Sequence, residues 1–147
     1  MSAPAVQVRP RLSPVTRIGL AVLGLLLGTM LLVACWLVPE TSGRGTHQQL
    51  GLPPCTFVLL FDSRCPSCGM TTAWAHVVRG QFVRAARANS GGMLLALSAL
   101  VVTPWSLTSA VRGRLTGRLP SEATLAIVAV AIVVTTLVDW LIRLSLE

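Results

Sequence analysis

The sequence predicts an all-α integral membrane protein with three transmembrane helices, an interfacial amphipathic helix and a cysteine-bearing loop. Composition is the first observation: 53% of the 147 residues are apolar and 12% are charged, with a mean hydropathy of +0.73. Soluble domains carry about 25% charged residues, so this chain could not cover a surface facing water. A free cytosolic enzyme, a disordered chain and a small secreted disulfide scaffold are therefore excluded. The second observation is three apolar runs, each long enough to cross a bilayer.

Two of these runs contain no charged residue, and the third contains one acid, Asp139. The second run includes Pro104, which neighbouring membrane helices can tolerate. The third is rich in β-branched residues, but it is far too long for a strand. We expect an N-terminal tail at 1–17, spans at 18–38, 88–111 and 123–142, a cysteine-motif loop with the interfacial helix at 39–87, a basic loop at 112–122 and a tail at 143–147.

The segment between the first two spans has a different character. Thr41 to Gln49 is polar and contains glycine, which is typical of a loop. Thr56 to Phe61 is an apolar run too short to span, so we expect it to be buried or re-entrant. Thr71 to Asn89 can form one helix with Thr72, His76 and three arginines on one face and Trp74, Val77 and Phe82 on the other. Such a helix is expected to lie on the membrane surface.

All twelve basic residues are arginines, and most flank the apolar runs. Arginines in these places meet lipid headgroups and set topology. No basic stripe with interleaved aromatic residues is present, so we expect a lipid bilayer as partner and no nucleic acid. With three spans, six arginines fall on each side. We place the N-terminus in the cytoplasm because Arg9, Arg11 and Arg17 precede the first span and none directly follows it.

Cys65-Pro66-Ser67-Cys68-Gly69 is the most specific motif in the chain. A Cys-x-x-Cys turn can place two sulfurs on one metal ion, and the glycine lets the backbone turn back toward them. A closed zinc site needs four ligands. Cys55 and His76 would complete a set of three cysteines and one histidine around one zinc ion, and His47 is a second candidate for the last place.

Two other interpretations of the cysteines stay open. Cys65 and Cys68 could form a redox-active dithiol, with Cys65 as nucleophile and Cys68 as resolving thiol. Alternatively, Cys65 could pair with Cys68, or Cys55 with either, in a structural disulfide, which an oxidising compartment would favour.

These residues resemble a known family. Cys55, a spacer of nine, Cys65 to Ala73, and then Val78-Arg79-Gly80, Ala85 and Asn89 are similar to the bacterial membrane-protein family catalogued as domain of unknown function 2752. The sequence departs from that pattern at Ser67, Thr72 and Ser90. The resemblance covers about residues 50 to 100. It implies a small multi-pass protein of a bacterial inner membrane with this cysteine loop between the first two spans, and it implies no particular activity.

Features within the spans have ordinary explanations. Leu32-Val33-Ala34-Cys35 fits a lipoprotein-processing box, but the apolar run continues past it, which favours Cys35 as a helix-packing residue. Gly24 and Gly28, four residues apart, would let another helix approach closely, within this chain or in a dimer. Asp139 is expected to pair with Arg143 at the end of its span, rather than to relay protons or ions.

No hydrolase triad, carboxylate pair or phosphate loop is present in the sequence. We therefore predict a non-enzymatic structural or partner-binding subunit, whose partner is another membrane protein or a second copy of the chain. A membrane thiol–disulfide oxidoreductase is the alternative.

Overall fold

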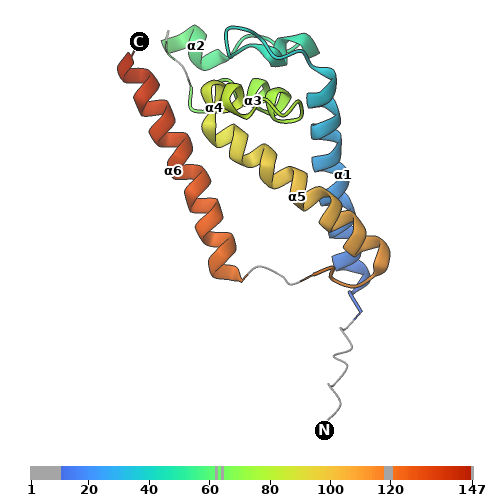
Figure 1. Cartoon of the computed structure of the whole chain (residues 1–147). Helices are drawn as coiled ribbons and strands as arrows, with labels where there is room; N and C mark the ends of the chain where they lie inside the picture. The colour runs from blue at the N-terminus through green and yellow to red at the C-terminus, as the bar shows by residue number, and fades with distance from the viewer. Residues whose placement is uncertain (1–10, 62, 64, 118–120, 147) are drawn as a thin grey trace.

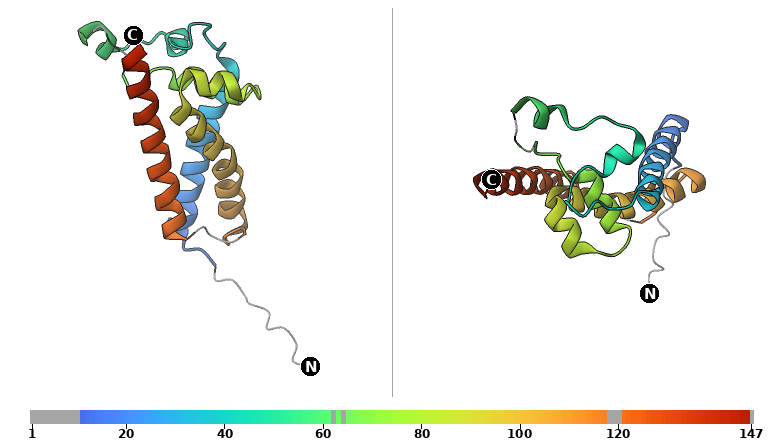
Figure 2. Two further views of the ribbon diagram at one scale, coloured as in Figure 1. Left: turned by 60° about the vertical axis from the view of Figure 1, so that its left-hand side comes forward. Right: turned by 90° about the horizontal axis from the view of Figure 1, so that it is seen from above.

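The computed structural model describes residues 11–61, 63, 65–117 and 121–146, and every regular element within them is a helix. Three long helices form the body of the molecule: α1 (Pro14–Trp36), α5 (Ser90–Arg112) and α6 (Glu122–Leu146). Four short helices gather at the end where α1 finishes and α5 begins (Figures 1 and 2). These are η1 (Thr46–Leu50), α2 (Thr56–Phe61), α3 (Met70–Val77) and α4 (Phe82–Ala88).

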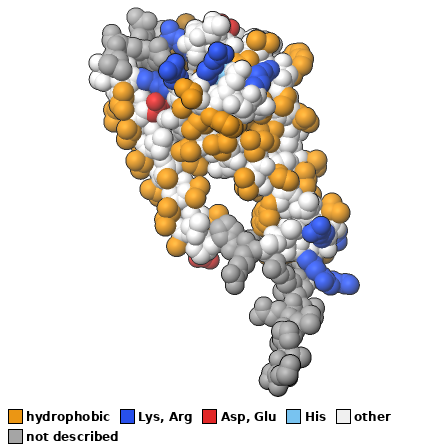
Figure 3. Space-filling view, in the orientation of Figure 1, with side chains coloured by type: hydrophobic (Ala, Val, Ile, Leu, Met, Phe, Trp, Pro, Cys, Tyr) orange, Lys and Arg blue, Asp and Glu red, His pale blue; other side chains and the backbone are white. Residues whose placement is uncertain are grey.

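The three long helices are apolar and long enough to cross a membrane, so the chain is a multi-pass membrane protein. Their outer faces carry large exposed apolar side chains, which Figure 3 shows over the flanks of the molecule. Leu32 on α1 is 71% exposed and Ile127 on α6 is 68% exposed. Such faces are suited to hydrocarbon rather than to water.

The helices are longer than, or shifted from, the expected spans. α1 begins at Pro14, before residue 18, because Ser13 caps it: its Oγ accepts a hydrogen bond from Thr16 N at 3.1 Å. Ser121 caps α6 in the same way through Thr124 N. α6 continues to Leu146, so the expected tail at 143–147 is helical as far as that residue. Residues 1–10 of the expected N-terminal tail and 118–120 of the basic loop lie outside the described residues.

Close packing of α1 against α5 depends on small residues. A Cβ on Gly24 would lie 2.6 Å from Leu107 Cδ2 on α5, so any larger residue would force the side chains of Leu107 and Ser106 to move. Ala34 on α1 and Ala96 and Ala99 on α5 are buried in the apolar core. Small residues let membrane helices approach closely and gain van der Waals contact. Gly24 therefore packs within the chain, one of its two expected roles.

The expected single helix over Thr71–Asn89 is wrong, because the chain breaks into α3 and α4. Gly80 lies between them with φ +71°, a left-handed conformation that a continuing α-helix cannot contain. α3 is also more deeply placed than a surface helix. Thr72 and His76, expected on its polar face, are both buried. The Thr72 hydroxyl lies 2.8 Å from that of Thr46, which supplies the polar partner its burial requires.

The apolar run Thr56–Phe61 forms the short helix α2, at the edge of the group of short helices (Figure 1). Leu59, Leu60 and Phe61 are each at least 65% exposed, so the expectation of burial within the protein is wrong. Among the described residues, nothing covers most of the surface of these side chains.

Arginine side chains donate hydrogen bonds to the C-terminal ends of helices that are distant from them in the sequence. Arg79 donates to the carbonyls of Ala34, Cys35 and Leu37 at the end of α1, at 2.7–3.2 Å, and to that of Ala75 on α3, the helix that ends just before it. Arg17 donates from Nε to Ala110 O in the last turn of α5. The last carbonyls of a helix lack intrahelical partners and carry partial negative charge, so a guanidinium suits them. These arginines were expected to contact lipid headgroups, but in the structure they bind the ends of neighbouring helices.

Cys35 is exposed on α1, so its expected packing role is wrong. Its carbonyl, rather than its thiol, makes the specific contact, because it accepts from Arg79.

Candidate metal centre

The cysteine motif forms a tight turn that leads directly into α3. Cys68 N donates to Cys65 O at 3.0 Å, and Met70 N donates to Ser67 O at 3.1 Å. Gly69 then adopts φ +84° as the N-cap of α3, and its carbonyl accepts from Ala73 N. The turn therefore has the backbone form that the glycine after the second cysteine predicts.

Gly69 is also where three segments of backbone meet. A Cβ at this position would overlap the carbonyl oxygen of Ala88 and lie 2.7 Å from that of Gly43. The end of α4 and the loop after α1 can approach the turn only because no side chain is present.

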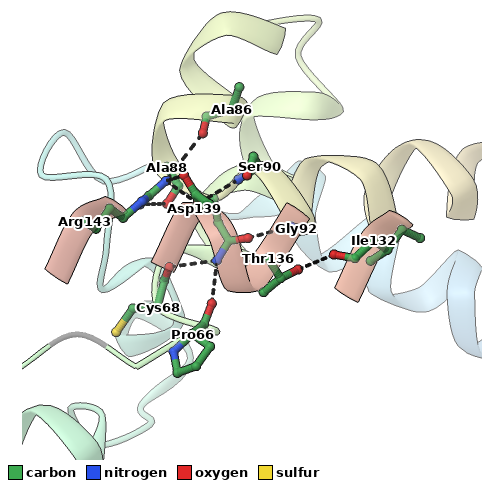
Figure 4. A network of polar contacts seen from close by, with 11 residues as sticks. Pro66, Cys68, Ala86, Ala88, Ser90, Gly92, Ile132, Thr136, Asp139 and Arg143 are labelled. Atoms are coloured by element: carbon green, nitrogen blue, oxygen red, sulfur yellow. Dashed lines mark hydrogen bonds and ion pairs between the residues drawn. The ribbon is translucent and has the colours of Figure 1, made fainter. Parts of the chain in front are cut away.

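Asn89 ties the same turn to the second transmembrane helix. Its Nδ2 donates to the carbonyls of Pro66 and Cys68 at 3.0 and 3.1 Å, and its Oδ1 accepts from Gly92 N at 2.6 Å (Figure 4). The side chain is 2% exposed. One amide group thus caps α5 and fixes the position of the cysteine turn.

An ion pair on α6 contacts the chain where α4 ends and α5 begins. Arg143 Nη2 lies 2.7 Å from Asp139 Oδ2, which confirms the expected pair. Asp139 accepts from Ser90 N at the start of α5, while Arg143 donates to Ala88 O at the end of α4 (Figure 4). The acid thus meets a helix N-terminus and the base a helix C-terminus, as the helix dipoles favour.

The structure brings three of the predicted ligands together. The Sγ atoms of Cys55, Cys65 and Cys68 all lie within 4.8 Å of one another, and the Cys55–Cys65 separation is 3.5 Å. Tetrahedral zinc with Zn–S bonds of about 2.3 Å requires sulfurs about 3.8 Å apart. The three thiols are half-buried and unpaired, so they can hold a soft metal ion with little rearrangement.

The predicted histidine ligand does not join this cluster. His76 Nδ1 lies 2.7 Å from Gln81 Oε1, and the residue lines a different pocket, together with Arg79 and Arg84. His47, the second candidate, lines the cavity that contains Cys55, Cys65 and Cys68. Both histidines are close enough in the sequence to reach the cysteines. In the structure, however, α3 directs the side chain of His76 toward Gln81.

That cavity has a volume of about 620 Å³ and is lined mainly by apolar side chains. Met30 and Val33 of α1 and Trp74 of α3 form part of its wall beside the thiols. Apolar surroundings limit the access of water to metal–thiolate bonds.

The three thiols are electrostatically unequal. Partial burial acts to raise the pKa of Cys65, but hydrogen bonds from Ser67, Cys55 and Cys68 outweigh burial and lower the pKa below its ordinary value. Burial, followed by the effect of Cys65 as a neighbouring charged group, raises the pKa of Cys68 to about 11. Negative charge in the cluster therefore settles first on Cys65, where metal binding or attack on a disulfide would begin.

Sequence reasoning missed the supporting role of Asn89 and the helix-capping role of Arg79. Both residues belong to the pattern that carries the family resemblance, which was the available signal. No curated protein and no solved structure matches the chain. A family model does match it over residues 55–103, which include the cysteine turn, α3, α4 and the first part of α5. This segment, about a third of the chain, is therefore similar to the family described as "Protein of unknown function (DUF2752)", the family that its cysteine pattern resembles.

Proposed function

We propose that Cys55, Cys65 and Cys68 bind a zinc ion that fixes the loop between α1 and α3 onto the membrane bundle. The observation that carries this proposal is the meeting of three sulfurs within 4.8 Å from two segments of chain. Thiolate ligands favour zinc and other soft metals over magnesium or calcium. In this proposal His47 supplies the fourth ligand, since it lines the same cavity.

The proposed role of the metal is structural. Asn89 and Gly69 already join the turn to α4 and α5, whereas Cys55 lies before α2, whose side chains are largely exposed. A metal bond to Cys55 would hold this otherwise loosely packed segment in place. The ordered loop would then be presented to a partner, either another membrane protein or a second copy of the chain.

The test is metal and thiol content of the full chain, purified in detergent without oxygen. We expect about one zinc per chain, with three thiols that react only after chelation or denaturation. Cys55→Ser, Cys65→Ser and Cys68→Ser should each lose the metal. Cys35→Ser is the matched control, because Cys35 is exposed on α1 far along the chain from the turn. His47→Ala should weaken zinc binding and His76→Ala should not. Retention of zinc by all three cysteine variants would contradict the proposal.

A thiol–disulfide oxidoreductase is the second candidate, favoured by the lowered pKa of Cys65. The Cys65 thiolate would attack a substrate disulfide to form a mixed disulfide, and Cys68 would then displace the second substrate thiol. The substrate is reduced to a dithiol and the protein is left with a Cys65–Cys68 disulfide. Metal-free protein with two thiols missing until reductant is added, and with turnover of a disulfide peptide, would favour this function over zinc binding.

We also propose the bacterial inner membrane as the location, with the N-terminus in the cytoplasm. Arg9 and Arg11 before α1, and Arg17 near its start, support that orientation. The short helices and the cysteine turn lie at the opposite end of α1 (Figure 1), so they would face outward. Labelling of Cys55 in intact cells by a membrane-impermeant maleimide, after chelation, tests this. An outward loop is labelled and an inward loop is not.

A further inference from the structure

A second pocket lies beside α4, separate from the cysteine cavity. Its volume is about 650 Å³, and its lining residues come from the loop after α1 and from α3 and α4. Arg79, Arg84 and Arg87 all line it, and Glu40 is the one acidic residue among the described residues that line it. The side chains at its rim therefore carry an excess of positive charge.

The three arginines are not equivalent. Arg79 directs both terminal nitrogens to carbonyl oxygens of α1 and α3, so it contributes charge but few free donors. Arg84 and Arg87 are exposed, and their side chains make no hydrogen bond or ion pair within the described residues. They are three residues apart on α4, so they share one face of that helix. Two like charges at this spacing repel each other unless an anion lies between them.

The pocket also has other polar groups in its wall. His76 and Gln81, paired at 2.7 Å, line it together with Thr41 and Ser42. A concave site with two free guanidinium groups, further polar groups and a single acidic residue among the described lining matches an oxyanion, since guanidinium forks bind phosphate through two parallel hydrogen bonds. The pocket stands at the end of the apolar spans, and Figure 3 shows arginine side chains gathered there above the apolar surface. This is the level at which lipid phosphates lie.

We propose that Arg84 and Arg87 form a binding site for a phosphate group in this pocket. The phosphate could come from the headgroup of an anionic phospholipid or from free inorganic phosphate. Arg79 adds positive charge to the pocket while its guanidinium donates to the carbonyls at the end of α1. The proposal is independent of the cysteine cluster, because none of the three cysteines lines this pocket.

The experiment measures equilibrium binding to the full chain in neutral detergent at fixed salt. The probes are dihexanoyl phosphatidylglycerol, a water-soluble anionic lipid, and inorganic phosphate. The test variant is Arg84→Gln with Arg87→Gln. The control is Arg112→Gln with Arg114→Gln, which removes the same charge from exposed positions at the other end of α5. All variants are first compared for their unfolding midpoint, which should match that of the parent because none of the four side chains has a hydrogen-bond or ion-pair partner among the described residues.

We expect the test variant to raise Kd at least about tenfold and the control to leave it unchanged, as loss of two charge-assisted contacts predicts. Binding of phosphatidylglycerol without competition from phosphate would identify the lipid headgroup as the source. Equal binding of inorganic phosphate would identify the free ion. An equal loss in both variants would show unspecific attraction between charges and would overturn the proposal. Absence of binding by either probe would overturn it too.

Discussion

Alanine at position 69 would place a methyl group inside the van der Waals radius of Ala88 O and 2.7 Å from Gly43 O, both of them backbone atoms. Displacing Ala88 O would also disturb the hydrogen bond that it accepts from Arg143 at 2.6 Å. The substitution also forces a side chain into φ +84°, the left-handed region. We therefore expect Gly69→Ala to separate the cysteine turn from the end of α4.

The magnitude follows from two contributions. A left-handed backbone costs a residue with a Cβ about 1 to 2 kcal/mol. Overpacking against fixed neighbours costs about 1 to 3 kcal/mol more. The free energy of unfolding should fall by roughly 2 to 5 kcal/mol, the sum of these two ranges.

Gly80→Ala separates the two contributions. Gly80 has φ +71°, but a Cβ there would meet no atom within 4 Å. This variant should lose only the left-handed contribution, about 1 to 2 kcal/mol. Both variants can be unfolded by sodium dodecyl sulfate in mixed micelles, with tryptophan fluorescence reporting the buried Trp74. Equal destabilisation by the two substitutions would refute the close approach of Gly69 to Ala88 and Gly43.

Three further outcomes are expected. Arg79→Gln should lower the free energy of unfolding by roughly 2 to 4 kcal/mol, since several charge-assisted hydrogen bonds are lost together, whereas Arg84→Gln should change it little; similar losses in a micelle unfolding titration would contradict the capping role. Asn89→Asp keeps an oxygen for the helix cap but loses the amide donors to the cysteine turn. Zinc affinity, measured by competition with a chelator, should therefore fall about 10- to 100-fold. An unchanged affinity would show that Asn89 does not support the site. In metal-free, reduced protein, iodoacetamide should modify Cys65 at lower pH than Cys68, because the thiolate forms as pH rises through each pKa and that of Cys68 is about 11; mass spectrometry showing the reverse order would contradict the charge distribution of the cluster.

The transmembrane helices could be predicted from the sequence because apolar length alone decides them. Their ends could not be predicted as well, since capping adds residues that are not apolar. Pro14 and Glu122 lie inside helices because Ser13 and Ser121 cap them. The break at Gly80 was visible only as a weak point in a helical pattern. The helix breaks there because Gly80 adopts a left-handed φ of +71°, and the neighbouring Arg79 binds the carbonyl of Leu37 after the end of α1, a contact that periodicity does not contain.

The candidate metal centre could be predicted in part. Two cysteines with a fixed spacing of three must lie near each other, so Cys65 and Cys68 follow from the chain itself. Cys55 joined them because its loop is short enough to return. The histidine could not be chosen by reach, since both His47 and His76 were within it. Burial of α3 decided against His76, and burial of that kind depends on packing against distant helices.

The arginine closures also constrain the order in which the protein can be assembled. Arg79 follows Leu37, whose carbonyl it binds, by 42 residues, and Arg143 follows Ala88 by 55. Ala110, which receives Arg17, comes 93 residues after it. During synthesis from the N-terminus, α1 therefore reaches the bilayer before the group that completes its end exists. The contact of Arg143 with Ala88 O, between α4 and α5, likewise forms only after α6 has been synthesised. For α1, insertion of the span and completion of its end are thus separate events in time. A chain truncated before Arg143 would lack the hydrogen bond from this residue to Ala88 O at the end of α4, beside the cysteine turn.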